Sequence, residues 1–369
     1  SLSPSPSPGR GGGHGLLDRL EAWCHAEGQR LAAHFAARKA GGYIRECHGD
    51  LHLGNIAWIP GSPPPLEEGG MKNQGQPLIF DAIEFNPDLR FIDVINEIAF
   101  LTMDLRHRGR PDLAWRCLNR YLEHTGDYAG LAALPYYQVY RATVRAKVAA
   151  IMAAQHAGRS ASDFSECLGY LKLADRLAHD RHAALILMHG VSGSGKTWYS
   201  QHLLERLGAV RLRSDVERKR LFGLAARDSS ADVPGGIYTR DAGERTLAQL
   251  LAQARGLLNA GFIVIVDATF IRRDWRTPFA RLANELTKER RLPWFIAAVS
   301  AAPERLRARV AQRMAAGQDA SEAGPAVLEA QLAAVEPFTE AEQDHVLSLT
   351  EDMEQSIEQI QAHFGRHEP

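Results

Sequence analysis

The most constraining feature of this chain is the segment Gly190–Thr197, which reads GVSGSGKT. It fits the pattern G-x-x-x-x-G-K-[ST], and it lies between an apolar run at 184–188 and a helix-compatible run at 198–207. In that setting, backbone N–H groups can surround phosphate oxygens, and the following helix adds its positive end. The segment therefore predicts a nucleoside triphosphate site. A glycine-rich turn before a buried helix, the alternative, does not explain the Lys-Thr pair.

The residue types within this segment have different expected roles. Lys196 is expected to reach the β- and γ-phosphates, and the Thr197 hydroxyl is expected to bind Mg²⁺. The predicted cofactors are therefore ATP and Mg²⁺. The predicted nucleotide-binding residues are Gly190, Ser192, Gly193, Ser194, Gly195, Lys196 and Thr197.

Composition narrows the possible partners and the compartment. The formal net charge is −1 over 369 residues, so no bulk field attracts nucleic acid or an anionic membrane, and two domains are expected. The four cysteines form no C-x-x-C pair, which is typical of free thiols in a reducing cytosol. No uninterrupted apolar run approaches the ~20 residues of a spanning helix. We therefore expect a cytoplasmic protein without a membrane partner; the oligomeric state stays open.

The first 180 residues combine three kinds of segment. Residues 1–15 are Ser/Pro-rich and then Gly-rich, which is typical of a disordered tail. Apolar spacing predicts a helix over 16–40, which the Gly41-Gly42 pair ends. The whole region 16–180 is expected to be mainly α-helical with a small β hairpin. Its expected strands lie at 43–47, 56–59 and 78–80, and its later helices at 91–107, 111–124, 134–157 and 162–180.

From residue 183 onward, apolar strand-like runs alternate with helical segments. This alternation predicts a parallel sheet covered by helices on both faces. We therefore expect an α/β fold for the second domain, 183–369, with the boundary near 181–183. The expected strands lie at 184–189, 209–213, 262–266 and 294–299, and the helices at 196–207, 215–223, 240–260, 274–290 and 303–315.

A polar motif follows the second of these strands. The segment 213–218 reads RSDVER and contains D-x-x-R, with Asp215 at the carboxyl end of a strand, where ligands bind in open α/β sheets. With the P-loop, it makes residues 183–350 resemble P-loop kinases of the gluconate kinase, polynucleotide kinase and zeta-toxin type. The resemblance implies that Asp215 accepts the proton of the acceptor hydroxyl and that Arg218 helps to hold the acceptor. Capping of the next helix by Ser214 or Asp215 is the alternative.

The buried strand at 262–266 ends in Asp267, which is a Walker-B-like arrangement. Asp267 is expected to hold Mg²⁺ directly or through water. Three arginines follow at once, and each is either a phosphate or acceptor contact or a solvated surface residue. They are Arg272, which we assign to the substrate, Arg273 and Arg276.

A third segment resembles the lid of such kinases. Arg305, Arg309 and Arg313 recur every four residues and so share one helix face. Fixed cations stabilise the charge that develops on a transferring phosphoryl group. We expect at least one of Arg309 and Arg313 to contact phosphate, with a salt-bridged exposed helix as the alternative. The D-x-S-E-A stretch at 319–323 and Gln331 also match the family.

A second motif lies at 48–55, which reads HGDLHLGN. Its D-x-x-x-x-N spacing matches the catalytic loop of protein kinases, in which the Asp orients the acceptor and the Asn binds Mg²⁺. With FDAIEF at 80–85, it resembles aminoglycoside phosphotransferases and choline-type kinases. The resemblance implies that Asp50 is a base and that Asn55 and Asp81 are metal ligands.

The region 16–180 also departs from that family. A kinase of this type has an N-terminal lobe with a Gly-rich loop and a strand lysine. Only 47 residues precede His48, and their only lysine is Lys39. We therefore expect 16–180 to be a C-terminal lobe alone, either truncated or used as a scaffold, and not to bind ATP productively. His48 and His52 are expected to be orienting or packed histidines, and Asp93 a structural acid.

The expected activity is ATP-dependent phosphoryl transfer by 183–369 to a hydroxyl of a small molecule. Two alternatives stay open: a nucleotide-binding regulator without turnover, and a polynucleotide 5′-end kinase, against which the near-zero charge argues. The acceptor cannot be read from the sequence, because loop side chains shape its pocket. The residues expected to act in transfer are Asp215, Lys196, Arg309 and Arg313, with Asp50 as the candidate of the first domain.

Overall fold

The computed structural model describes residues 11–60, 75–155, 164–231, 233, 235–290, 292–316, 320–350 and 352–365. The chain divides into two compact units, which are described separately below. Unit 1 comprises Ser1–Ala114 and Gly130–Arg181, and unit 2 comprises Trp115–Ala129 and His182–Pro369. Residues 1–10 of the expected tail lie outside the described residues. Residues 11–15 belong to a helix instead, because extending a long helix adds a hydrogen bond for each residue fixed.

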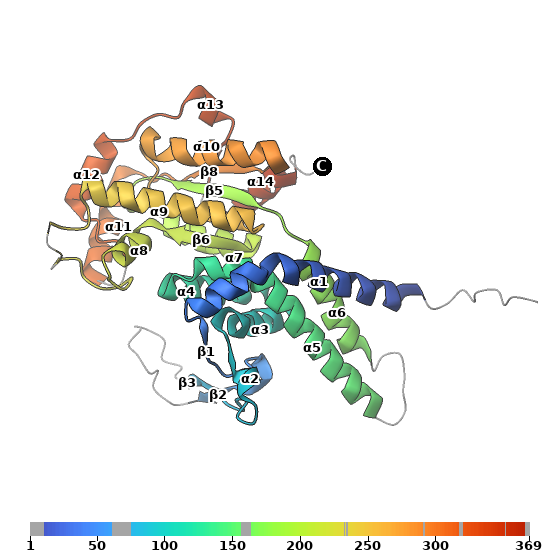
Figure 1. The fold of residues 1–369 in the computed structure, drawn as a ribbon. Coiled ribbons are helices and arrows are strands. Elements are labelled where there is room, and N and C mark those ends of the chain that lie inside the picture. The colour runs from blue at the N-terminus through green and yellow to red at the C-terminus, as the bar shows by residue number, and fades with distance from the viewer. Residues whose placement is uncertain are drawn as a thin grey trace, which may run out of the picture. The chain divides into compact units, whose positions relative to one another are not determined.

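Unit 1 is built mainly from four helices (Figure 1). They are α1 (Gly11–Ala40), α3 (Val94–His107), α5 (Leu134–Gln155) and α6 (Ser165–His179). Their shared core contains Leu20, Phe100, Met103, Val139 and Tyr170. The helices expected over 16–40, 134–157 and 162–180 are therefore present as α1, α5 and α6, and residues 156–157 and 162–163 lie outside the described residues.

Two short antiparallel pairs complete unit 1. Strand β1 (Ile44–Glu46) pairs with β4 (Phe91–Asp93), and β2 (Ile56–Pro60) pairs with β3 (Gly75–Ile79). The helix expected over 91–107 begins only at Val94, because 91–93 form β4 and Asp93 caps the helix by accepting from the Ile95 amide. Asp93 also forms a buried ion pair with Arg38, with N–O distances of 2.6 and 2.7 Å. Two short helices flank the strands, η1 (Leu53–Asn55) and α2 (Pro87–Arg90).

Unit 2 contains a five-stranded sheet in the order β6-β7-β5-β8-β9, and every neighbouring pair is parallel. The interior strands are almost fully buried, as expected for a sheet covered on both faces. The predicted α/β fold with a parallel sheet between helices is therefore confirmed for this part of the chain. The strands are β5 (Ala184–His189), β6 (Ala209–Arg213), β7 (Ile263–Asp267), β8 (Trp294–Ala298) and β9 (Val346–Ser348).

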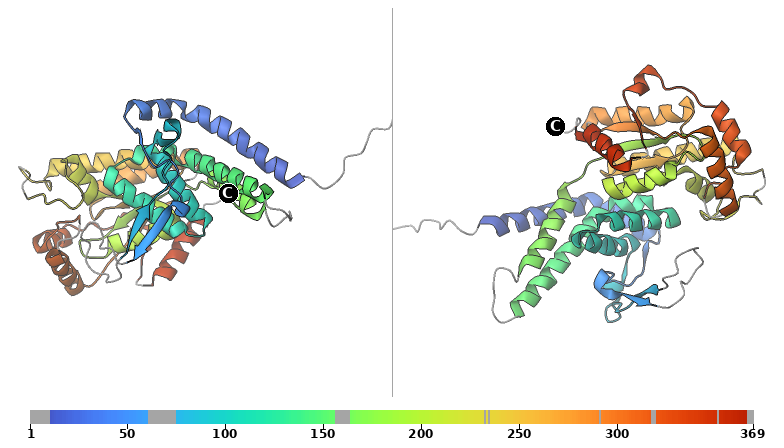
Figure 2. Two further views of the ribbon diagram at one scale, coloured as in Figure 1. Left: turned by 90° about the horizontal axis from the view of Figure 1, so that it is seen from below. Right: turned by 180° about the vertical axis from the view of Figure 1, so that it is seen from behind.

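The helices of unit 2 lie on the two faces of the sheet (Figures 1 and 2). Helices α7 (Lys196–Leu207) and α14 (Met353–Gly365) pack on one face around Ile186, Met188 and Phe295. Helices α9 (Arg240–Asn259) and α10 (Arg273–Arg290) cover the other face. The remaining helices are α8 (Ser214–Leu221), α11 (Pro303–Ala316), α12 (Pro325–Ala333) and α13 (Glu340–Gln343).

One segment from the first half of the sequence belongs to unit 2. Residues 115–129 cover most of helix α4 (Pro111–Thr125) and part of the turn η2 (Tyr128–Ala132). Asn119 of α4 pairs with the backbone of β6, and Arg116 pairs with Glu205 of α7. The sequence pattern predicts this helix but carries no signal for its packing partner. Among the described residues, no helix has both the length and the apolar character needed to span a bilayer.

Candidate functional site

The loop between β5 and α7 is formed by glycines in conformations that other residues rarely adopt. Gly190, Gly193 and Gly195 have φ angles of 145°, 82° and 106°. A Cβ atom on Gly190 would lie 2.4 Å from the Val299 carbonyl oxygen, and one on Gly193 would lie 2.9 Å from the Leu306 carbonyl oxygen. Both positions therefore require glycine, and the loop backbone is left open to a close-lying ligand.

Lys196 begins helix α7 and is buried behind this loop. Its Nζ atom donates to the Val191 carbonyl at 2.9 Å. Burial lowers the pKa of Lys196 to about 8, against the raising effect of the Asp267 and Asp215 carboxylates. The nearby Ser194 hydroxyl is buried without a hydrogen-bond partner. A buried ammonium group beside an unpaired hydroxyl suits an anionic ligand such as a phosphate chain.

Asp267 ends strand β7, directly beside Met188 of β5 in the parallel ladder. It is 6% exposed, and its Oδ2 atom accepts from the Ser200 hydroxyl at 3.0 Å. Asp267 and Thr197 line the same cavity. Among the described residues, no group of three or more His, Cys, Asp or Glu side chains could hold a metal ion. Carboxylate and hydroxyl oxygens are ligands that Mg²⁺ accepts, so Asp267 and Thr197 fit a Mg²⁺ ion that also takes phosphate oxygens and water as ligands.

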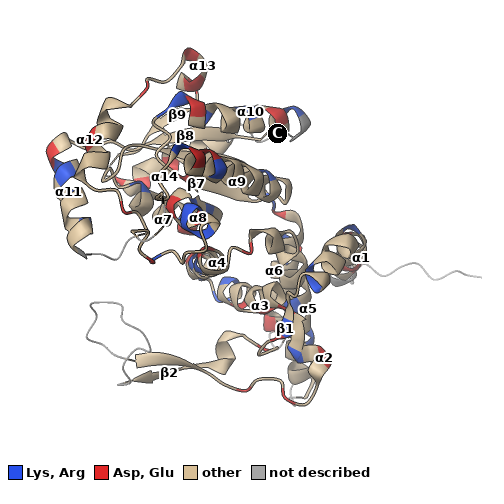
Figure 3. Ribbon diagram, turned by 60° about the vertical axis from the view of Figure 1, so that its left-hand side comes forward, with Lys and Arg blue, Asp and Glu red and all other residues tan. Residues whose placement is uncertain are grey.

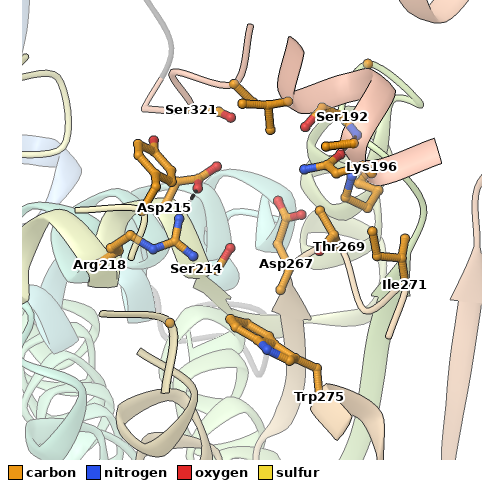
Figure 4. Close-up of a pocket in the computed structure, with 18 of the residues that line it drawn as sticks. Ser192, Lys196, Ser214, Asp215, Arg218, Asp267, Thr269, Ile271, Trp275 and Ser321 are labelled. Atoms are coloured by element: carbon orange, nitrogen blue, oxygen red, sulfur yellow. Dashed lines mark hydrogen bonds and ion pairs between the residues drawn. The ribbon is translucent and has the colours of Figure 1, made fainter. Parts of the chain in front are cut away.

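These groups open into a cavity of about 1040 Å³ at the carboxyl ends of the strands. Figure 4 shows Lys196 and Asp267 on one side of it and Asp215 with Arg218 on the other. This is the side of an open α/β sheet where ligands bind. The lining also includes Arg213, Tyr238, Trp275 and Gln331.

The two residues of the D-x-x-R motif lie on helix α8 and line the cavity. Asp215 is in the first turn of α8, and its Oδ1 atom accepts from Arg218 Nη1 at 3.1 Å. The Arg218 guanidinium in turn lies 5.0 Å from the Tyr238 ring centroid. The capping alternative is wrong, because Arg213 occupies the N-cap position and makes no side-chain cap bond. Asp215 therefore faces the cavity without a capping role.

The three arginines after β7 differ in their surroundings. Arg272 lines the cavity and forms an exposed pair with Asp274. Arg276 is fully buried, donates to the Phe270 and Pro337 carbonyls and pairs with Glu342 at 2.8 Å, so it is neither a phosphate or acceptor contact nor a solvated surface residue. Arg273 is absent from the cavity lining. Of the three, only Arg272 is placed to meet a ligand in this cavity.

Helix α11 brings two of the three lid arginines to the cavity. Arg309 donates to the Gly193 and Ser194 carbonyls at 3.3 and 3.1 Å, and Arg313 donates to the Ala323 carbonyl at 2.7 Å. Both line the cavity, whereas Arg305 does not. Basic residues of α8 and α11 are visible in Figure 3. The two arginines are thus positioned beside the loop that is expected to hold phosphate.

The D-x-S-E-A stretch now has a structural explanation, although Asp319 lies outside the described residues. The Glu322 carboxylate accepts from the backbone and hydroxyl of Ser230 and pairs with buried Lys219 at 3.0 Å. Gln331 of α12 accepts from the Ser192 amide at 2.7 Å. Glu322 thus joins the segment after α11 to helix α8 and to Ser230, and Gln331 joins helix α12 to the loop between β5 and α7.

The motif of unit 1 forms a separate polar cluster. Asn55 donates to the Asp50 carbonyl at 3.0 Å and to its carboxylate at 3.2 Å, and the His52 ring lies 3.5 Å from that carboxylate. The pKa of Asp50 is lowered, first by the His52 hydrogen bond. Asp81 is exposed with φ of 62°, directly after Phe80, whose amide donates to the Asn55 carbonyl. Asp50 and Asn55 are thus in contact, and the Phe80–Asn55 bond places Asp81 at the next position of the chain.

Four residues at or near the site were not predicted from the sequence, and two of them, Tyr238 and Trp275, line the cavity. Tyr238 and Trp275 lie on loops and helix starts without a motif, so no sequence signal marks them. Ser200 lies one helical turn after Lys196, on the same face of α7, and this spacing was an available signal. Arg211 is a charged residue inside a buried strand, which was also an available signal.

Comparison with known families finds a match within unit 2. Residues 185–338 match the family described as an AAA domain. Uncharacterized proteins from Mycobacterium tuberculosis and Mycobacterium bovis are 32% identical over 254 residues, which is 68% of this chain and 47% of each relative. The chain thus spans about half the length of the curated relatives it matches. Because unit 2 is shorter than the matched length, the match includes residues of unit 1.

Solved structures show weaker likenesses. A candidate kinase from Chloroflexus aurantiacus is 22% identical, with a TM-score of 0.40, over 51% of this chain and 99% of its own. A gluconokinase from Sinorhizobium meliloti is 18% identical, with a TM-score of 0.33, over 50% of this chain and 94% of its own. These values are too low to transfer an activity to this chain.

Proposed function

We propose that unit 2 is an ATP-dependent phosphotransferase that moves the γ-phosphoryl group of ATP to a hydroxyl of a small molecule. The observation that carries this proposal is the shared cavity. Lys196 and Asp267 lie on one side of it and Asp215 and Arg218 on the other, so groups suited to phosphate and groups suited to an acceptor face the same space. A site for nucleotide binding alone does not require a second polar wall.

The chemistry follows from the residues present. The acceptor oxygen attacks the γ-phosphorus, the bond from that phosphorus to the bridging oxygen of ADP breaks, and Asp215 takes the acceptor's proton. Lys196, Arg309 and Arg313 supply fixed positive charge where the phosphoryl group carries negative charge. Arg218 and Arg272 are proposed to hold the acceptor. Mg²⁺, when bound at Thr197 and Asp267, would neutralise phosphate charge.

Two other functions are compatible with nucleotide binding. A regulator would bind ATP but would not consume it, whichever acceptor is added. A polynucleotide 5′-end kinase would need contacts to a phosphate backbone. Figure 3 shows basic and acidic residues interspersed along the helices of unit 2, which favours the small-molecule acceptor.

The role of unit 1 is a second proposal. Its Asp50–Asn55 cluster has the spacing of a kinase catalytic loop, but the region contributes no P-loop of its own. We infer that turnover by this chain depends on unit 2 and not on Asp50.

An ATP-consumption screen tests these proposals. The acceptors are sugars, sugar acids, aminoglycosides and oligonucleotides with free 5′ ends, and the wild type is compared with Lys196→Ala and Asp50→Ala. We expect an acceptor-dependent signal that disappears in Lys196→Ala and persists in Asp50→Ala. Turnover that survives Lys196→Ala but is lost in Asp50→Ala would move the working site to unit 1.

A further inference from the structure

Helix α4 completes the edge of the sheet of unit 2. Strand β6 is an edge strand, so among the described residues one side of its backbone has no neighbouring strand. The Asn119 side chain, which is 2% exposed, fills this place by donating to the Ala209 carbonyl at 2.9 Å and accepting from the Arg211 amide at 2.7 Å. A single amide thus satisfies two buried backbone groups of the edge strand.

One turn further along α4, Glu123 forms a buried ion pair with Arg211. Its Oε1 atom lies 2.6 and 3.1 Å from the Arg211 Nη2 and Nε atoms, and the side chains are 7% and 5% exposed. Arg213 lies 3.6 Å from the other oxygen. Removal of the Glu123 charge would leave the Arg211 charge without its nearest counterion in a buried position.

Arg211 also contacts the first turns of helix α7, which follows the nucleotide-binding loop. Its Nη1 atom donates to the Ser200 hydroxyl at 3.1 Å and to the Thr197 carbonyl at 3.4 Å. Ser200 is fully buried, and its hydroxyl lies 3.0 Å from Asp267 Oδ2 and 3.1 Å from the Thr197 carbonyl. Because Arg211 fills an acceptor site on this hydroxyl, the single hydroxyl proton is directed to Asp267 and Thr197. These are the two residues that fit a Mg²⁺ ion.

We propose that Glu123, Arg211 and Ser200 are positioning residues for the metal-dependent part of nucleotide binding. Ser200 holds one oxygen of Asp267 and the backbone of Thr197, Arg211 orients Ser200, and Glu123 of α4 holds Arg211. The inference rests on the proposed function only in that it takes Thr197 and Asp267 as the metal site. It assigns helix α4, which lies outside the matched family region, to the nucleotide site.

Calorimetric titration of the full chain with ATP, in EDTA and at stepped MgCl₂ concentrations, tests this inference. Mg²⁺ is expected to increase the affinity for ATP. We expect Glu123→Gln and Ser200→Ala to raise the Mg²⁺ concentration that gives half of this increase by about 10- to 100-fold. The affinity for ATP in EDTA should change by less than about threefold, since the P-loop amides and Lys196 are untouched. Arg116→Ala is the matched control, because Arg116, whose side chain is 59% exposed, also joins α4 to α7, through a pair with Glu205 at 2.7 Å.

Three results would overturn the inference. One is that Ser200→Ala loses the same ATP affinity with Mg²⁺ as without it. The Ser200→Ala variant alone tests the inference if Glu123→Gln does not fold. The second is the same Mg²⁺ shift in Arg116→Ala. The third is a wild type whose ATP affinity does not depend on Mg²⁺. A wild type that shows the expected Mg²⁺ pattern but phosphorylates no acceptor would overturn the phosphotransferase proposal alone.

Discussion

Asp215 is the residue whose substitution separates chemistry from nucleotide binding. Its carboxylate faces the cavity from the first turn of α8, opposite Lys196 (Figure 4). Asp215→Asn keeps the shape of the side chain but cannot accept a proton, so we expect kcat to fall by about 10²- to 10⁴-fold. The affinity for ATP should stay within a few-fold of the wild type. Steady-state kinetics with the acceptor found by the screen, together with ATP titration, measure both quantities.

Glu285→Gln is a control for this substitution. Glu285 is an exposed carboxylate on α10 that pairs with Arg255, and it is not among the residues that line the cavity. Its variant should have wild-type kcat. If Asp215→Asn raised only the KM for the acceptor and left kcat unchanged, Asp215 would be a binding residue rather than a base.

His189 gives the free energy of unfolding a dependence on pH. It ends β5, lies against Phe338 with ring centroids 4.6 Å apart, and has a buried Nε2 atom without a partner. Burial lowers the pKa of His189 to about 4, and Arg276 and Lys196 add to this effect while Glu342 opposes it. Between pH 6.5, the pKa of His189 in the unfolded chain, and about pH 4, His189 is therefore neutral in the folded protein. In the same pH range His189 of the unfolded chain binds a proton.

We therefore expect the free energy of unfolding to be unaffected by His189 above pH 6.5 and to fall as the pH is lowered towards 4. The loss should be of the order of 1 to 3 kcal/mol. His189→Phe keeps an aromatic ring against Phe338 and cannot titrate, so its stability should fall less over this range. Urea unfolding at several pH values measures the difference. Parallel losses in both proteins would assign the pH dependence to other groups.

At the scale of elements, α11 combines two kinds of arginine. Arg309 and Arg313 line the cavity, whereas Arg307 pairs with Glu329 on the exposed side at 2.7 Å. We expect at least one of Arg309→Ala and Arg313→Ala to lower kcat by on the order of 10²-fold, because a fixed charge beside the phosphoryl group is lost. Arg307→Ala removes the same side chain from the same helix and should leave kcat near the wild-type value. If all three variants had equal activities, neither Arg309 nor Arg313 would act in phosphoryl transfer, and the role of the helix would be packing alone.

The local elements of unit 2 could be predicted from the sequence because each carries its own signal. Continuous apolar runs mark β5, β7 and β8, and the helices between them have regular apolar spacing. The P-loop is equally local, since its glycines and Lys196 act within a few residues of one another. Strand β9 and helices α12, α13 and α14 were not predicted; β9 has only three residues, two of them half-buried and one exposed.

Long-range packing could not be predicted in the same way. Arg276 and Arg272 look alike in the sequence, but only Arg276 meets the Glu342 carboxylate 66 residues away and becomes buried. In the sequence, Asn119 is one more polar residue on an amphipathic helix. Its role in the structure is to form hydrogen bonds with the backbone of a strand 90 residues later. Such roles depend on tertiary contacts that residue spacing does not encode.

At the scale of the whole molecule, the chain passes between the two units more than once. Residues up to Ala114 belong to unit 1, 115–129 to unit 2, 130–181 to unit 1 and the rest to unit 2. Helix α4 should therefore unfold together with the sheet that it borders, although its neighbours in the sequence belong to unit 1. This coupling can be measured with a ligand that binds unit 2.

Hydrogen exchange followed by mass spectrometry provides that measurement. A ligand at 100 times its Kd stabilises the folded state by about 2.7 kcal/mol, which slows exchange through unfolding by about 100-fold. With Mg²⁺ and ATP, we expect this slowing in peptides from β5 and β7 and also in residues 115–125 of α4, because Asn119 and Glu123 bind β6. Peptides from α5 should change little, and Lys196→Ala should lose the effect throughout. Slowing in β5 and β7 with unchanged exchange in α4 would show that the helix opens independently of the nucleotide site.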